Sequence, residues 1–347
     1  MTFDKKTLLV PVGDDDGLQT AASMLRSGEL VIFPTETVYG LGASALDACA
    51  AYDVFEAKGR PHDNPLIVHI AYPEDAEKIA YTTKLYRRLA DAFMPGPITI
   101  ILKKREIIPD EVTAGGNTVG IRCPVHPTAH RFIELSGVPV AAPSANLSGK
   151  PSPTRFSHCT DDMMGRVSAI IDGGECDVGL ESTVVLLSGE DSLKILRPGG
   201  VSRDELLTVC SEVTFAEGLS EGEIPLSPGM KYKHYAPKSP LVLLDGEVQK
   251  VKAYVKDRLS FGESCLFICY DEDVSEFPEC GISIGGRDDA KSHARRLFAA
   301  LREADAIGET RRVDVIYSYA PQRGSEGLSP AIYNRLIRAA NHTIRRV

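Results

Sequence analysis

Short apolar segments alternate with amphipathic segments along most of this 347-residue sequence. Several of the apolar segments are only four or five residues long, as buried strands are. They span residues 30–33, 66–70, 98–102 and 138–142. The intervening residues 14–27, 48–57 and 83–93 carry apolar side chains at helical spacing. This alternation predicts an α/β fold, in which helices cover a largely buried sheet.

A second alternation begins near residue 241 and runs to the C-terminus. Apolar segments over 241–244, 265–270, 282–284 and 313–317 predict strands, and residues 248–259, 288–306 and 330–344 predict helices. The pattern is typical of a small parallel sheet wrapped by helices. It contains neither a complete Gly-x-Gly-x-x-Gly motif nor a Walker loop, so no nucleotide site is signalled by sequence there.

A linker is expected between the two alternating regions. Residues 218–239 are rich in glycine, proline and serine, yet they contain a cluster of basic and aromatic residues that ends at Tyr235. A plain spacer needs no such cluster, although a linker that packs on the surface remains the alternative. We therefore expect a first domain over 14–210, a linker over 211–239 that contacts something, and a second domain over 240–347.

Charge and cysteine usage limit the classes of partner. The net charge of −9, with both signs interspersed, argues against broad adhesion to nucleic acid or to an anionic membrane. The eight cysteines are scattered without a Cys-x-x-Cys pair, so neither a disulfide framework nor a zinc site is signalled. No stretch has the pattern of a signal peptide or the length of a membrane span. These features suit a cytoplasmic protein that does not bind membranes.

Polar loops follow several of the predicted strands. Residues 34–42 bring hydroxyls, a carboxylate, a phenol and two glycines directly after one strand, and residues 143–154 form a loop dense in hydroxyl groups. Another strand ends in Arg122. Such positions are where α/β sheets place their sites. The ordinary alternatives are a turn whose threonines satisfy backbone groups and an arginine that forms a surface ion pair.

Two cations flank a glycine at residues 58–60. Lys58 and Arg60 are expected just past the end of the helix over 48–57, and the next strand carries His69. A Lys-Gly-Arg turn by itself is usually solvated. Here rigid elements are predicted at both ends of the loop, and such a loop is suited to holding functional groups.

Together these segments resemble the YrdC-like threonylcarbamoyl-AMP synthases, in their longer form with an appended C-terminal domain. The resemblance rests on an ordered set of motifs that spans most of the chain. The motifs are residues 34–42, 58–60, 64–69, 95–99, 122–124, 144–146, 152–154, 181–184, 197–199 and 227–237. The resemblance implies a twisted open α/β catalytic domain over 14–210, a linker that acts as an active-site lid, and a smaller Rossmann-like α/β domain.

The same resemblance implies a reaction in which L-threonine, bicarbonate or CO2, and ATP give threonylcarbamoyl-AMP and pyrophosphate. The product would feed the threonylcarbamoyl modification of the tRNA adenosine next to the anticodon, through downstream transferase components. Two polyanionic reactants must meet in such a site, so cations are needed to bring them together. Mg2+ is expected with ATP, held mainly by phosphates and water, because no compact carboxylate cluster offers a cage.

Residue roles also follow from the resemblance, position by position. The expected catalytic residues are Lys58, Arg60, Ser144 and Asn146. The expected threonine contacts are Thr37, His69, Arg122, Ala142 and Ser182. The expected ATP contacts are Arg60, Asn64, Thr118, Ser144, Ser152, Arg197 and Tyr235. No metal ligands are assigned, and no general base is conspicuous: His69 is favoured as a substrate-binding group and Glu36 as an orienting group.

Two other functional classes stay open at this point. An RNA-binding module is one, since a concave basic surface accepts tRNA, although the acidic total charge and the absence of an aromatic RNA-binding signature weigh against it. Direct tRNA binding is thus a weak expectation. The other is a carbamoyl-transfer enzyme that acts on a different acceptor. Stimulation of turnover by threonine distinguishes the two enzyme classes.

Overall fold

The structure, a computed structural model, describes residues 4–216, 235–321, 324 and 326–347. The chain divides into two compact units. The first contains the described residues up to Ser148 and from Ser152 to Ala216. The second contains Gly149–Pro151 and the described residues from Tyr235 onward. Each unit has its own sheet, as the two alternating regions of the sequence predict.

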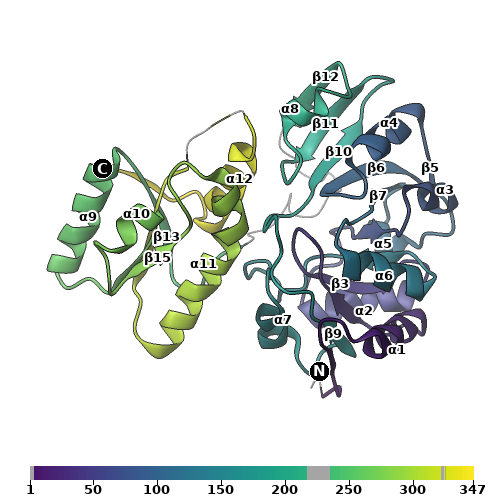
Figure 1. The fold of residues 1–347 in the computed structure, drawn as a ribbon, viewed down its shortest axis with the longest axis horizontal. Coiled ribbons are helices and arrows are strands. Elements are labelled where there is room, and N and C mark those ends of the chain that lie inside the picture. Colours follow the sequence, from purple (N-terminus) through teal and green to yellow (C-terminus); the bar gives the residue numbers. More distant parts are fainter. Residues whose placement is uncertain (1–3, 217–234, 322–323, 325) are drawn as a thin grey trace. The chain divides into compact units, whose positions relative to one another are not determined.

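A mixed sheet of 12 strands forms the described part of the first unit, in the order β1-β9-β2-β3-β8-β4-β7-β6-β10-β11-β12, with β5 paired to β6 (Figure 1). The strands are β1 (Leu8–Val10), β2 (Val31–Phe33), β3 (Gly40–Ser44), β4 (Ile67–His69), β5 (Ala80–Tyr81), β6 (Ile98–Lys104), β7 (Thr118–Arg122), β8 (Val140–Ala142), β9 (Ala169–Ile171), β10 (Thr183–Leu187), β11 (Ser192–Arg197) and β12 (Glu212–Phe215). The strands predicted at 30–33, 66–70, 98–102 and 138–142 are all found, each within three residues of its predicted bounds.

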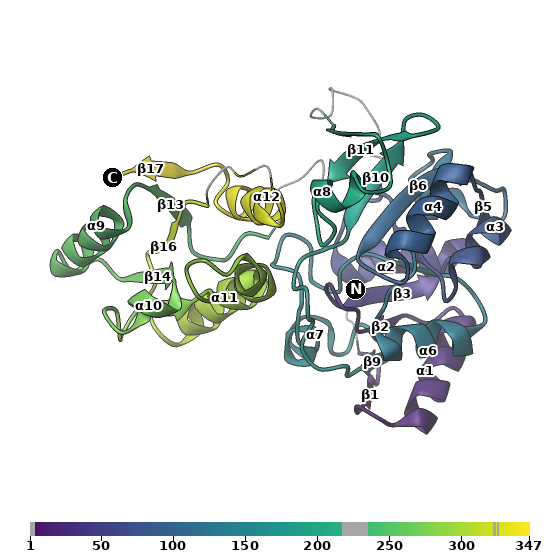
Figure 2. The same cartoon turned by 45° about the horizontal axis from the view of Figure 1, so that its top comes forward.

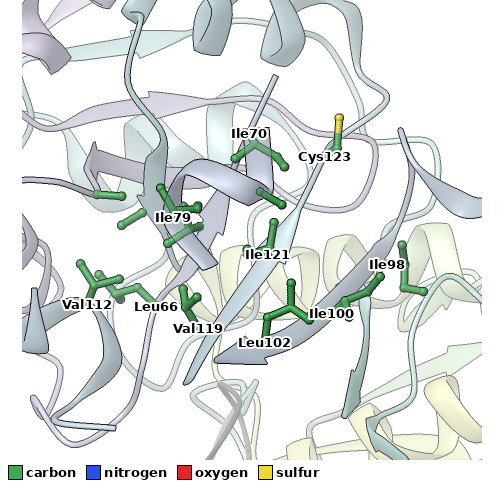
Figure 3. Packing of buried hydrophobic residues seen from close by; sticks show 14 of the residues in the cluster. Leu66, Ile70, Ile79, Ile98, Ile100, Leu102, Val112, Val119, Ile121 and Cys123 are labelled. Carbon is green, nitrogen blue, oxygen red and sulfur yellow. The ribbon is translucent and has the colours of Figure 1, made fainter. Parts of the chain in front are cut away.

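Helices cover this sheet on both faces. They are α1 (Asp15–Arg26), α2 (Ala48–Lys58), α3 (Ala76–Ile79), α4 (Lys84–Phe93), α5 (Asp110–Thr113), α6 (Pro127–Ser136), α7 (Phe156–Met163) and α8 (Arg203–Leu206). Alternate residues of β2 show the division: Val31 and Phe33 pack with α1 and α6, whereas Ile32 packs with α2. Figure 3 shows part of the larger of these clusters, in which Ile100 of β6 lies beside its register partner Ile121 of β7. The sheet is therefore the middle of three layers.

The second unit has a five-stranded sheet in the order β15-β14-β16-β13-β17, and every pair in it is parallel. Its strands are β13 (Leu241–Asp245), β14 (Cys265–Cys269), β15 (Gly281–Ser283), β16 (Val315–Tyr319) and β17 (Ile344–Arg346). Its helices are α9 (Val248–Ser260), α10 (Asp271–Val274), α11 (Ala290–Thr310) and α12 (Ser329–Ala339). In Figures 1 and 2, α9 and α10 lie on one side of this sheet and α11 and α12 on the other. The prediction of a small parallel sheet wrapped by helices is confirmed.

Three sequence predictions need correction. The helix predicted over 330–344 ends at Ala339, because Asn341 and His342 adopt positive φ angles of 47° and 60°, and the chain then enters β17. The expected linker over 211–239 begins with strand β12, which pairs with β11 in the large sheet. Lys58 is the last residue of α2 rather than a residue beyond its end. The linker residues 217–234 lie outside the described part of the chain.

Four helices of the first unit were not predicted from sequence: the four-residue helices α3 and α5, and the longer α6 and α7. Helix α6 carries a proline at its start and packs Phe132 and Ile133 against α1, and α7 buries only Cys159, Asp162 and Met163. Both are short and carry few apolar residues, so their periodicity is weak. Among the described residues, no helix is long and apolar enough to cross a membrane.

Candidate active site

The end of α2 positions two of the predicted site residues. Gly59 ends the helix in the left-handed conformation (φ 62°), and the amides of Gly59 and Arg60 donate to the carbonyls of Glu56 and Phe55. The buried Lys58 ammonium donates to the main-chain carbonyls of Ser144 and Asn146, each at 2.5 Å. Lys58 thereby joins α2 to the loop that follows β8.

The loop after β8 holds the other predicted pair. The Ser144 hydroxyl donates to Asn146 Oδ1 at 2.6 Å, and Asn146 Nδ2 donates to the Leu147 carbonyl at 2.8 Å. The amide of Ser148 donates to the carbonyl of Lys58 at 3.0 Å. The structure therefore brings Lys58, Ser144 and Asn146 together in one hydrogen-bonded cluster, although Lys58 is more than 80 residues from the other two in sequence.

Three of the predicted threonine contacts come from adjacent strands. His69 ends β4 and is the register partner of Arg122, which ends the parallel strand β7. Ala142 ends β8, the antiparallel neighbour of β4, where it pairs with Ile67. All three side chains are buried. Parallel strands β4 and β7 finish at the same edge of the sheet, so the imidazole and the guanidinium face the same region.

Arg122 forms an ion pair with Glu36 in the loop between β2 and β3. Arg122 Nη2 donates to Glu36 Oε1 at 2.6 Å, and both side chains are 5% exposed. Among the described residues, Glu36 Oε2 and Arg122 Nε are buried without a hydrogen-bond partner. A buried pair that leaves polar atoms unsatisfied carries a desolvation cost. It also leaves one acceptor and one donor available to a substrate in a water-poor site.

Thr35 and Thr37 complete this loop. Thr35 Oγ1 lies 2.9 Å from Thr37 Oγ1, donates to the Val38 carbonyl at 2.6 Å, and accepts from the Val38 amide. Arg122 Nη2 also approaches Thr35 Oγ1 at 3.4 Å. These bonds form a side-chain turn that holds Thr37 beside the ion pair. Thr37 is therefore brought to the same place as Arg122, as the resemblance implies.

His69 is neutral in this environment. Burial, followed by the positive charge of Arg122, lowers the pKa of His69 to about 3. Its Nδ1 lies 3.2 Å from the Ile67 carbonyl and 3.3 Å from the Val140 carbonyl. Carbonyl oxygens only accept hydrogen bonds, so Nδ1 carries the proton and Nε2 presents a lone pair. Such an imidazole accepts a hydrogen bond well but is a weak general base at neutral pH.

Ser182 and Arg197 lie together at the start of β10 and the end of β11. Ser182 Oγ is 2.8 Å from Thr99 Oγ1, and Arg197 Nη2 donates to the Ser182 carbonyl at 3.1 Å and to its hydroxyl at 3.2 Å. Strands β6 and β10 are parallel neighbours, which places Thr99 beside Ser182. The buried Ser152 hydroxyl donates at 2.7 Å to Oε1 of Glu181, the residue that precedes Ser182.

The remaining predicted ATP contacts are more dispersed. Arg60 Nη2 donates to the Asn64 carbonyl at 3.2 Å, so these two residues share one loop. Thr118 begins β7 whereas Arg122 ends it, and four residues of strand separate their Cα atoms by roughly 13 Å. The structure therefore does not bring Thr118 to Arg122. Tyr235 belongs to the second unit, where its ring lies 5.0 Å from that of Phe298.

Sequence reasoning did not assign a role to Thr35 or Thr99. Thr35 is the centre of the turn that holds Thr37, and Thr99 fixes the Ser182 hydroxyl. Both residues stand inside matched motifs, but their side chains face protein partners that only the sheet brings near. In the part of the chain that the structure describes, no group of three or more histidine, cysteine or acidic side chains is arranged to hold a metal ion.

The buried charges of the first unit suit an anionic ligand. Lys58, Arg122 and Arg197 are each at most 7% exposed, and the buried carboxylates near them in the hydrogen-bond network include Glu36 and Glu181. Buried cations that are fixed by main-chain carbonyls and by a neighbouring strand need no reorganisation to meet a charged substrate. These buried cations are therefore suited to binding an anionic group.

Comparisons with known proteins agree with this fold. Residues 23–199 match the family model of the Sua5, YciO and YrdC proteins, described as "Telomere recombination". Residues 201–341 match the model described as "Threonylcarbamoyl-AMP synthase, C-terminal domain". The threonylcarbamoyl-AMP synthase of Pyrococcus abyssi is 41% identical to this chain, over 95% of the chain and 96% of its own length. The threonylcarbamoyl-AMP synthase of Bacillus subtilis is also 41% identical, over 96% of the chain and 95% of its own length. The crystal structure of Pyrococcus abyssi Sua5 complexed with L-threonine superposes with a TM-score of 0.87 at 39% identity, covering 98% of this chain and 99% of that one.

The first unit, in which a mixed sheet lies between two layers of helices and buried basic residues form the candidate site, defines a protein of the YrdC-like class. Both units are matched, and the relatives are aligned over nearly their whole lengths. The chain belongs to the threonylcarbamoyl-AMP synthase family, in its long form with the additional C-terminal domain.

Proposed function

We propose that this chain is an L-threonylcarbamoyladenylate synthase, a nucleotidyltransferase that makes threonylcarbamoyl-AMP from L-threonine and ATP. The observation that carries the proposal is the 41% identity to two enzymes of this name over at least 95% of the chain. A relative whose structure contains L-threonine has the same fold over 98% of the chain. The buried basic site of the first unit has the chemistry that the reaction needs.

The third reactant is bicarbonate or CO2. The threonine nitrogen forms a bond to the carbon of CO2 and loses a proton, which gives an N-carboxylate. An oxygen of that carboxylate then attacks the α-phosphorus of ATP, and the bond from this phosphorus to the pyrophosphate oxygen breaks. Both reactants are anionic, so their alignment and the compensation of their charges decide the height of the reaction barrier. Correct placement alone can lower this barrier by about 7–11 kcal/mol.

Threonine recognition is assigned to the ends of β4 and β7, with Ala142 added from the neighbouring antiparallel strand β8. The Arg122 guanidinium pairs with the amino acid carboxylate, and it is held for this purpose by Glu36 at 2.6 Å. His69 Nε2 accepts a hydrogen bond from the threonine hydroxyl or amine, since its Nδ1 proton is directed at two carbonyls. Thr37, Ala142 and Ser182 complete the assigned contacts, as the family resemblance implies.

ATP recognition and catalysis are assigned to the loops around the end of α2. Arg60 and Lys58 compensate phosphate and carboxylate charge, and Ser144 and Asn146 complete the catalytic set. Asn64, Thr118, Ser152, Arg197 and Tyr235 are the further proposed ATP contacts. The lid role of the linker, through Tyr235, stays a prediction. Mg2+ would enter with ATP on phosphate oxygens and water, since the described carboxylates form no cage.

The product requires a partner that transfers the threonylcarbamoyl group to tRNA adenosine. A mixed anhydride of this kind hydrolyses in water, so prompt delivery to a transferase component is expected. We propose that the protein works in the cytoplasm, because all eight cysteines are free thiols and such chains suit a reducing compartment. Direct tRNA binding is a weaker proposal, given the net charge of −9.

Pyrophosphate release from ATP tests the proposal. We expect release by the purified protein only when threonine and bicarbonate are both present, and we expect Arg60→Ala to reduce the rate by about a hundredfold or more. Arg87→Ala is the matched control, because Arg87 is a solvent-exposed arginine paired with Glu77. Release that ignores threonine would instead support carbamoyl transfer to another acceptor. Absence of release from a folded protein would direct attention to RNA binding.

A further inference from the structure

A cavity of about 330 Å³ lies in the second unit, and the reaction proposed above makes no use of it. Its walls come from the carboxyl ends of β14 and β16 and from the starts of α9, α11 and α12. Tyr270 directly follows β14, and Tyr319 is the last residue of β16. Every strand pair in this sheet is parallel, so the cavity opens at the edge where open α/β sheets bind ligands.

The cavity also lies at the point where the strand order reverses. Strands β14 and β16 are neighbours, but α10 leads from β14 to β15 at one edge of the sheet whereas α12 leads from β16 to β17 at the other. The two helices therefore leave the sheet in opposite directions and cover opposite faces, as Figures 1 and 2 show. Tyr270, which immediately precedes α10, and Ser329, the first residue of α12, both line the cavity. A crevice between such diverging connections is the general location of ligand sites in this architecture.

Aromatic side chains form one wall. The rings of Tyr270 and Tyr319 are stacked with centroids 4.6 Å apart and an interplanar angle of 8°, and the His293 ring is 5.2 Å from Tyr270. The Tyr319 hydroxyl is held by Asp273 at 2.9 Å. Ile284 adds an apolar surface. Planar π surfaces with apolar neighbours favour a ligand that contains a flat ring.

A guanidinium lies beside this aromatic wall. Arg287 is centred 5.5 Å from the Tyr270 ring, and its Nη2 donates to both oxygens of Asp273 at 3.1 Å. Asp273 is shared with Lys252 at 3.2 Å, so one carboxylate serves two cations. Within the described residues, Arg287 Nε is buried without a hydrogen-bond partner. A cation with an unused donor, placed among aromatic rings, favours an anionic group on the same ligand.

We propose that this cavity binds a nucleoside monophosphate, with the base against Tyr270, Tyr319 and His293 and the phosphate toward Arg287. The volume lies at the lower end of the range of small-molecule pockets, which suits a mononucleotide rather than a dinucleotide. A glycine-rich fingerprint serves the close approach of a pyrophosphate, so its absence from this unit does not conflict with a single phosphate. The proposal does not depend on the reaction assigned to the first unit.

Photolabelling of the full-length protein with 8-azido-AMP tests the proposal. We expect label on peptides that contain Tyr270 or Tyr319, and we expect AMP to prevent it more effectively than adenosine or ribose 5-phosphate. Arg287→Ala should raise the AMP concentration needed for protection by about tenfold or more. Lys291→Ala is the matched control, since it removes an exposed cation from the first turn of α11 outside the cavity lining. It should leave protection unchanged.

A second variant separates this site from the one in the first unit. Ala290 lines the cavity from the first turn of α11, so Ala290→Phe fills it without removing a charge. This variant should lose the label on the second unit while keeping threonine-dependent pyrophosphate release. Label confined to peptides of the first unit, at saturating 8-azido-AMP, would overturn the proposal. The proposal would also be overturned if Arg287→Ala and Ala290→Phe both fold and both keep the full label on the second unit.

Discussion

At the residue scale, His69 shows how burial decides a chemical role. A histidine poised for proton transfer has a pKa near neutrality, whereas burial and Arg122 lower the pKa of His69 to about 3. The unfolded chain binds this proton at pH values below about 6.5, but the folded chain does not bind it until about pH 3. The contribution of His69 to stability is therefore complete above about pH 6.5 and is lost as pH falls toward 3.

A pH series of urea unfolding tests this assignment. Between pH 6 and pH 4, His69 should lower the free energy of unfolding by up to about 1.4 kcal/mol per pH unit. The variant His69→Gln should have a shallower slope over this range, because its side chain binds no proton. Identical slopes for wild type and His69→Gln would mean that His69 is protonated within the folded protein.

The Arg122–Glu36 pair is the second feature at this scale. Arg122→Ala should remove threonine-dependent activity and destabilise the fold by about 3–5 kcal/mol, since Glu36 would remain as a buried carboxylate without its partner. Adding Glu36→Gln should recover much of the lost stability but none of the activity. Chemical unfolding and pyrophosphate release measure the two effects separately. A double variant as unstable as Arg122→Ala would show that the cost arises from lost packing rather than from the unpaired charge.

At the element scale, the end of α2 connects backbone geometry with the catalytic cluster. Gly59 has φ 62°, and a Cβ built on it meets no atom within 4 Å. Substitution there is therefore opposed by backbone strain and not by a clash. The amides of Gly59 and Arg60 close the helix, and Lys58 reaches the loop after β8. A change at Gly59 should thus affect both flanking cations.

Gly59→Val should destabilise the protein by about 1–2 kcal/mol and reduce activity strongly, because a β-branched residue resists the left-handed conformation. Gly59→Asn is the matched variant, since asparagine adopts this conformation more readily and should retain most of the activity. Steady-state pyrophosphate release and thermal unfolding give the two readouts. Equal behaviour of the two variants would show that φ at this position is not what holds Lys58 and Arg60.

At the scale of the whole molecule, each unit carries its own sheet and its own buried core. Phe132 packs between α6 and the large sheet, and Phe267 packs against Phe277 and Tyr319 in the small one. Such an organisation predicts unfolding in two steps rather than one. Phe132→Ala should lower the free energy of unfolding of the first unit only, and Phe267→Ala that of the second unit only, each by about 3–5 kcal/mol. Differential scanning calorimetry is the measurement, and a common shift of both transitions would contradict the prediction.

Sequence patterns predicted the elements whose signal is local. The strand over 98–102 and the helix over 14–27 were found with small changes of boundary, because continuous apolar runs and helical spacing are properties of short segments. The helix predicted over 330–344 failed at its end, where positive φ angles at Asn341 and His342 turn the chain into β17. Strand β12 falls within the predicted linker because the apolar periodicity fades after residue 210; only Val213 of its four residues is buried.

The sequence by itself determined the α/β class, the two alternating regions and the family motifs, since each depends on neighbouring residues or on their order. Tertiary structure alone decided which residues meet. The register of β4 with β7 places His69 beside Arg122, and Lys58 reaches a loop more than 80 residues away. It also decided that His69 is neutral, because the desolvation that lowers its pKa depends on burial by distant segments. The cavity of the second unit likewise exists only where β14 and β16 become neighbours with diverging connections, a relation that no local pattern encodes.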